Sequence, residues 1–174
     1  MQRSLKGVIG LAVLFTAAQA HAQSYTTATT SAVASATILQ PITLLKTTDL
    51  AFGSMVRPST GTNVIVINES TGARSVTGGG DAALGAATNT RATYSVGGTG
   101  GATFSITVPS SVTLTRSGGS ETMPVTLASS ATTGTLSNGT SGTANFGVGG
   151  SLPLATTTVP GSYSGTFDVT VGYN

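Results

Sequence analysis

The stretch "PGSYSGTFDVTVGYN", residues 160–174, decides the fold class predicted for this chain. From residue 166 onward polar and apolar side chains alternate, and the apolar face consists of Phe167, Val169, Val171 and Tyr173. Alternation with a period of two is typical of a β-strand with one buried face. The strand either pairs on both edges within a complete sandwich or keeps one edge free, and the sequence leaves both arrangements open.

Short runs with similar alternation fill the rest of the chain. They lie at 31–40, 42–47, 49–56, 62–68, 73–78, 91–97, 102–109, 111–117, 122–129 and 143–156. Turn-forming Gly, Pro, Ser and Asp residues separate many of them, and no long segment has apolar residues at helical spacing. Regularly spaced short strands of this kind indicate an all-β sandwich or barrel.

Two of these runs say more about the arrangement of strands. Val64 to Ile67 is apolar on both faces, which predicts a central strand or a strand between layers. Pro41 falls inside the first β run and cannot donate a ladder hydrogen bond. It therefore predicts an edge strand, or a break where the first strand changes sheets.

The first residues predict export. Arg3 and Lys6 precede an apolar run from Gly7 to Ala18, and Ala20-His21-Ala22 has the small-x-small pattern of a cleavage site. The apolar run is shorter than the roughly 20 residues that a membrane span needs, so residues 1–22 are expected to be a secretory signal peptide. We expect an exported chain in the periplasm, at the cell surface or outside the cell, with no membrane span after cleavage.

The residues after this segment have no net formal charge. Of seven Lys and Arg residues in the chain, two lie in the predicted signal peptide, which leaves five against five Asp and Glu. The five basic residues are scattered singly, so no nucleic-acid partner is expected. Charged residues make up 7% of the chain, against about 25% in soluble domains. A surface with so few charges favours association with copies of the same chain or with another surface.

Residues 23–174 lack the side chains of the commonest catalytic and metal sites. The chain has no Cys, and its single histidine is His21 in the predicted signal peptide. Ser–His and Cys–His nucleophiles and the usual zinc and copper sites are therefore excluded. The five acids are isolated in sequence, and the glycine clusters lack the spacing of phosphate-binding loops. We expect no enzymatic activity, no cofactor and no metal.

Three segments carry a resemblance to a known family. They are "ATILQPITLLKTTDLAFGSMV" at 36–56, "FGVGGSLPL" at 146–154, and the stretch at 160–174 quoted above. Together they resemble the proteobacterial secreted proteins known as the domain of unknown function 4402 family, which is similar in turn to spore-coat-U-like and archaic chaperone–usher pilus subunits. The resemblance covers residues 32–174. It implies an immunoglobulin-like antiparallel β-sandwich that lacks its last strand.

The resemblance also implies a mode of assembly. In fibre-forming relatives a periplasmic chaperone fills the gap in the sandwich first, and the N-terminal extension of the next subunit fills it afterwards. Transferred to this chain, the gap is bordered by an acceptor edge that consists of Phe167, Val169, Val171, Tyr173 and Asn174. The basic residues of such a chaperone would hold the carboxylate of Asn174.

The donor is expected from residues 23–31, which precede a sandwich domain at 32–174. The apolar groups at this end of the chain give the donor candidates Tyr25, Ala28 and Ala32, of which the first two lie on opposite faces of an extended strand. A donor that runs on through Val33, Ala34, Ala36 and Ile38 would require the subunit to spare its own first strand.

These observations predict a non-enzymatic, exported surface or structural subunit, pilus-like or adhesive, that assembles by strand exchange. Its expected partners are neighbouring subunits and a periplasmic chaperone. The alternative is a stand-alone secreted β-sandwich that binds a glycan or another cell-surface component. Exposed aromatic side chains would be typical of that alternative, yet the chain has no Trp and four Tyr.

Overall fold

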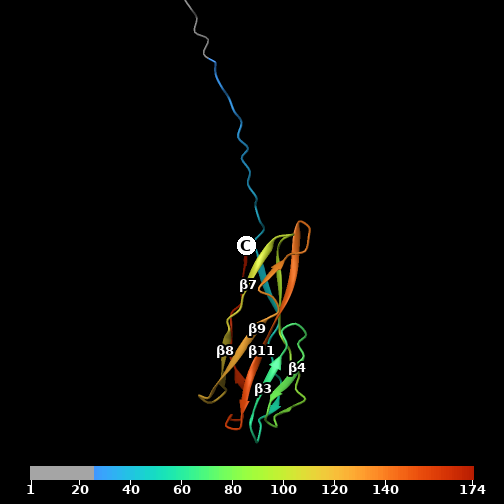
Figure 1. The fold of residues 1–174 in the computed structure, drawn as a ribbon, viewed down its shortest axis with the longest axis vertical. Coiled ribbons are helices and arrows are strands. Elements are labelled where there is room, and N and C mark those ends of the chain that lie inside the picture. The colour runs from blue at the N-terminus through green and yellow to red at the C-terminus, as the bar shows by residue number, and fades with distance from the viewer. Residues whose placement is uncertain (1–25) are drawn as a thin grey trace, which may run out of the picture. The chain divides into compact units, whose positions relative to one another are not determined.

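The structure is a computed structural model that describes residues 26–174. The described chain falls into a first unit, which ends at Ala36, and a compact second unit, Thr37–Asn174. Residues 26–36 contain no strand, and all regular structure of residues 37–174 is β (Figure 1). The predicted signal peptide and Tyr25 lie outside the described residues. Over residues 26–174, no helix has the length and apolar character that a membrane span requires.

The second unit contains strands of very different lengths. In chain order they are β1 (Thr43–Thr48), β2 (Met55–Val56), β3 (Thr62–Ile67), β4 (Arg74–Gly78), β5 (Ala83–Leu84), β6 (Ala92–Thr99), β7 (Thr103–Thr107), β8 (Ser111–Arg116), β9 (Thr122–Ser129), β10 (Thr133–Thr135), β11 (Ser141–Ala155), β12 (Tyr163–Ser164) and β13 (Thr170–Tyr173). Most of them coincide with the apolar runs of the sequence, because alternating side chains place one face of each strand on the core.

The strand order corresponds in part to that of an immunoglobulin-like sandwich. The largest sheet has the order β1-β6-β11-β9-β8-β12, a second has β10-β7-β13, and β2 pairs with β5. In immunoglobulin domains strands A, B, E and D share one sheet, and C, F and G share the other. Here β1, β6, β11 and β9 follow the order of A, B, E and D, and the pair of β7 and β13 follows C and F, whereas β8 and β12 join the largest sheet through β9. The predicted all-β, antiparallel sandwich is confirmed.

Strand β11 organises the core. Its first half pairs with β6, its second half pairs with β3 on the same edge, and β9 pairs with its other edge. Side chains of β11 therefore reach the interior along most of its 15 residues. The largest fully buried residues are Phe104, Ile65, Ile67, Leu136, Val96, Val125, Val148 and Pro58. The central position predicted for Val64 to Ile67 is confirmed, because β3 lies between β4 and β11.

The start of the first strand differs from the prediction. Residues 31–40 were expected to be a strand, but the first strand begins at Thr43 and residues 26–41 are all exposed. Alternation alone does not make a strand, because a strand also needs a neighbour for its ladder hydrogen bonds. The break in the first strand follows Thr48, where β1 ends and the chain continues to β2, and Pro41 lies ahead of the strand.

The closing strand lies at an edge. β13 pairs with β7 and, within the described residues, with no other strand. The predicted strand from residue 166 to 173 is interrupted, since pairing stops between β12 and β13 over residues 165–169. The opposite segment contains Pro109, which has no amide hydrogen to donate. The alternation of burial nevertheless persists, with Phe167 and Val169 half-buried and Asp168 exposed.

Asp81 fastens the turn before β3. Its carboxylate accepts hydrogen bonds from the Ser59 amide (2.6 Å), the Ser59 hydroxyl (2.6 Å) and the Thr60 amide (3.0 Å). These bonds, the Ser59 hydroxyl foremost, lower the pKa of Asp81 from 3.8 to about 2. Because the pKa is lower in the folded state, the stabilisation is complete above the unfolded value and is lost as the pH falls toward 2.

We therefore predict that Asp81→Asn lowers the free energy of unfolding at pH 7 and that its difference from wild type shrinks toward pH 2. Urea unfolding at both pH values measures this difference. The exposed carboxylate variant Asp168→Asn serves as control and is expected to change stability little. An Asp81→Asn deficit of equal size at both pH values would contradict the assignment.

Candidate functional site

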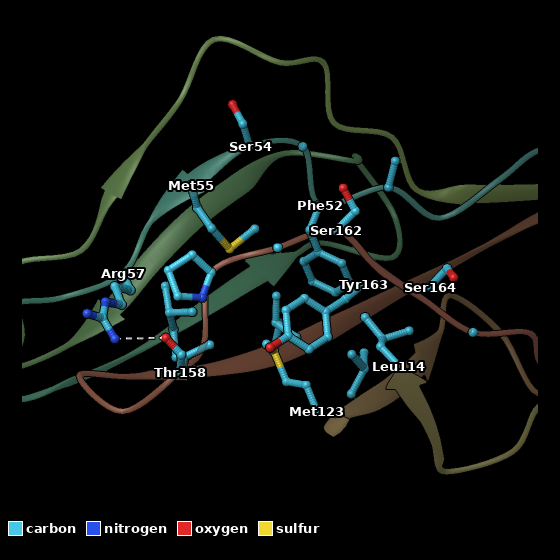
Figure 2. A pocket seen from close by; sticks show the side chains of 18 of the residues that line it. Phe52, Ser54, Met55, Arg57, Leu114, Met123, Thr158, Ser162, Tyr163 and Ser164 are labelled. Atoms are coloured by element: carbon cyan, nitrogen blue, oxygen red, sulfur yellow. Dashed lines mark hydrogen bonds between the residues drawn. The ribbon is translucent and has the colours of Figure 1, made fainter. Parts of the chain in front are cut away.

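An open apolar groove runs between two segments that are far apart in sequence. Residues 50–57, which follow β1, form one wall, and residues 158–165 with Phe167 form the other. The cavity between them has a volume of about 940 Å³. Figure 2 shows Phe52 and Met55 on the first wall, Tyr163 on the second, and Leu114 and Met123 on the far side of Tyr163 from Met55. The floor side chains come from β8, β9 and β11 and are Val112, Leu114, Met123, Val125, Leu152 and Leu154.

The first wall is held from its outer side. Ala51 and Thr90 exchange both backbone hydrogen bonds (2.8 and 2.9 Å), and β2 pairs with β5. The Arg74 guanidinium donates to the carbonyl oxygens of Phe52 (2.8 Å) and Gly85 (2.7 Å) and so joins this wall to the segment behind it. The outer edge of the wall is thus occupied, whereas no strand of residues 26–174 pairs with the edge that faces the groove.

The second wall has the same one-sided pairing. Tyr163 and Ser164 form β12 and pair with β8, and the Ser117 amide donates to the Ser162 carbonyl (2.8 Å). The Tyr163 hydroxyl donates to the carbonyl of Val159 (2.7 Å), which fixes the aromatic ring within its own wall. Over residues 26–174, no strand pairs with the groove-facing edge of this wall either. Two strand edges therefore face each other across an apolar floor.

One contact ties the two walls together. The Arg57 guanidinium on the first wall donates to the carbonyl oxygen of Thr158 (3.0 Å) at the start of the second wall (Figure 2). It also donates to the carbonyl oxygen of Thr156 (2.7 Å), just before that wall. Arg57 is also the one charged side chain among the described residues that line the groove. The groove therefore offers apolar surface and backbone hydrogen-bonding groups, with no cluster of charge to attract an ion.

The residues predicted for the acceptor edge lie partly in the groove and partly beyond it. Of the five, all within the described chain, Phe167 lines the groove. The side chains of Val169, Val171 and Tyr173 pack on the core farther along the sandwich, and the Asn174 amide donates to the Thr103 carbonyl (3.2 Å).

The candidate donor residues are placed only in part. Ala28 and Ala32 are exposed and carry no strand, and Tyr25 is outside the described residues. Because β1 begins at Thr43, a donor that runs on to Ile38 takes nothing from the first strand. Val33 and Ile38 are 98% and 93% exposed, although both are apolar.

Sequence reasoning missed the first wall as part of the site. The run at 49–56 was predicted as a strand, yet nothing in its alternation shows which edge stays unpaired. Tyr163 and Arg57 were missed for the same reason. The signal that was available is the glycine in Leu50-Ala51-Phe52-Gly53, because a glycine inside a strand pattern often marks a close approach of another backbone.

The fold and the groove together define a class: an antiparallel, immunoglobulin-like β-sandwich with one pair of facing strand edges left open. Comparison with known families narrows this class. The family model described as "Domain of unknown function (DUF4402)" matches residues 42–173, and the chain belongs to this family. No curated protein and no solved structure matches the chain.

Gly53 allows the first wall to approach the segment behind it. Its φ is +74°, and a Cβ atom there would lie 2.5 Å from both the Ala87 carbonyl oxygen and an Arg74 guanidinium nitrogen. We predict that Gly53→Ala lowers the free energy of unfolding by at least about 1–2 kcal/mol, the backbone cost of a left-handed residue with a side chain. The matched control is Gly79→Ala, where a Cβ would meet nothing within 4 Å. Urea unfolding compares the two, and equal stabilities would contradict this role of Gly53.

Proposed function

We propose that the chain is an exported surface subunit that assembles by strand exchange, with the groove of one copy accepting an extended segment of a neighbouring copy. The observation that carries this proposal is the pair of facing strand edges above an apolar floor. An extended segment added between them gains main-chain hydrogen bonds from both walls, and its alternate side chains contact the floor. An apolar edge left exposed is otherwise an aggregation hazard.

The candidate donor segment has the pattern of a short strand. Within residues 26–39 the even-numbered positions 32, 34, 36 and 38 are Ala, Ala, Ala and Ile, whereas the intervening positions 33, 35 and 37 are Val, Ser and Thr. An extended segment from Ala32 to Ile38 therefore has one apolar face and one mainly polar face, and it is about 23 Å long.

The side-chain sizes on the two partners are complementary. The groove floor carries large side chains such as Leu114, Met123 and Leu152, and the candidate donor face carries alanines with one isoleucine. Small residues opposite large ones allow two layers to approach closely without voids. The predicted donor candidates Ala28 and Ala32 lie on this even-numbered face, and Tyr25 lies on the other.

The predicted export supports the same function, since a chain with few charges and an open groove is suited to assembly outside the cytoplasm. The resemblance to pilus subunits implies that a periplasmic chaperone covers the groove before assembly. The alternative function is a stand-alone module that binds a glycan or cell-surface component, and the aromatic side chains of Phe52, Tyr163 and Phe167 in the groove are the feature that would serve it.

We predict that residues 23–174, expressed in a periplasm, form a ladder of oligomers on an unboiled denaturing gel. Ala34→Asp would place a charge against the apolar floor, a burial that is costly without a partner, and is expected to abolish the ladder. The matched variant Ser35→Asp places the same charge on the opposite face and is expected to retain it.

Deletion of residues 26–39 should also remove the ladder while the remaining sandwich still unfolds cooperatively. A stable monomer that unfolds identically with and without residues 26–39 would overturn strand exchange. That result would favour the stand-alone module.

A further inference from the structure

A tyrosine fixes the backbone immediately before the first strand. The Tyr173 hydroxyl, at the end of β13, donates to the Gln40 carbonyl (2.9 Å) and accepts from the Thr99 amide (2.8 Å). The Gln40 amide donates in turn to the Thr99 side-chain oxygen (2.6 Å). Both backbone groups of Gln40 are therefore engaged, one by β13 and one by β6. We call this set of contacts the Gln40 anchor.

The anchor depends on a glycine in β6, Gly98, which leaves room for the Tyr173 hydroxyl. Tyr173 belongs to the second sheet, and its ring reaches across to β6 in the first. A Cβ atom on Gly98 would overlap the Tyr173 hydroxyl, so the glycine in β6 makes room for it. Tyr173 is also half-buried against the core, which restricts its side chain to few rotamers.

The anchor determines where residues 26–39 can go. To enter the groove of its own copy, this segment would have to reverse direction close to Gln40. Pro41 has a fixed φ, and the residue before a proline is disfavoured from the helical region that tight turns use. Gln40 is that residue, and a turn there would break its hydrogen bonds to Tyr173 and Thr99.

We propose that the Gln40 anchor commits residues 26–39 to the groove of a second copy of this chain and prevents them from filling their own. The inference rests on the proposed strand exchange and adds the residues that make it intermolecular. Tyr173 acts here as a positioning residue, since it lies beyond the groove and holds the chain from which the donor segment departs.

The test uses crosslinking, which is unambiguous because the chain contains no cysteine. Ala36→Cys in the donor segment and Ser164→Cys on the groove wall are combined in residues 23–174 and joined with a short bis-maleimide. The pair is placed in three backgrounds: wild type, Tyr173→Phe, which removes only the anchoring hydroxyl, and Tyr94→Phe. The last is the control, since Tyr94 lies in β6 stacked on Phe146, with ring centroids 5.1 Å apart.

We expect crosslinked oligomers in the wild-type and Tyr94→Phe backgrounds. In the Tyr173→Phe background the ratio of internally crosslinked monomer to crosslinked oligomer should rise at least about tenfold at a fixed protein concentration, as the loss of one hydrogen bond allows. The fraction of chains that form the internal crosslink before they associate should not depend on protein concentration. If Tyr173→Phe does not fold, Thr99→Val replaces it, because this change removes the acceptor of the Gln40 amide and is expected to shift the ratio in the same direction.

The results distinguish a failure of the Gln40 anchor from a failure of strand exchange. Crosslinked oligomers of equal yield in all backgrounds would overturn the role of the anchor and leave strand exchange intact. No crosslink of either kind in any background, together with no ladder from the wild-type chain, would overturn both.

Discussion

Backbone amide and carbonyl groups need hydrogen-bond partners wherever they lie, so each edge of a sheet requires a neighbouring strand or water. In this domain two such edges face each other across one apolar floor. The contacts of Arg74 behind the first wall and of Arg57 between the walls fix these two edges in place without filling the space between them. The site is thus defined by two strand edges with which no strand of residues 37–174 pairs.

The proposed donor segment alternates more regularly than the donor candidates Tyr25 and Ala28 indicate. In the sequence, the donor candidates Tyr25 and Ala28 lie on opposite faces of an extended strand. The structure starts β1 at Thr43, which leaves the more regular stretch from Ala32 to Ile38 outside the sandwich. In the proposed strand exchange, its small side chains would lie against a floor of large ones.

Much of the fold could be predicted from sequence because period-two alternation is present in most of the longer strands. The errors have physical causes. Residues 31–40 alternate as a strand does but have no partner, and β5 and β10 are too short to show any period. The groove was predicted only at Phe167, since alternation reports which face of a strand is buried and is silent about which edge is paired. The Gln40 anchor joins residues 133 positions apart, and nothing local marks it.

The one-sided pairing of the two walls has a mechanical consequence. Ladder hydrogen bonds lie roughly perpendicular to the strands that they join. If fibre tension is transmitted along a strand held between both walls, those bonds are sheared together and are not peeled apart one at a time. A joint of this kind withstands pulling through many weak contacts that fail simultaneously, which would give a chain without any cysteine a strong link that requires no covalent bond.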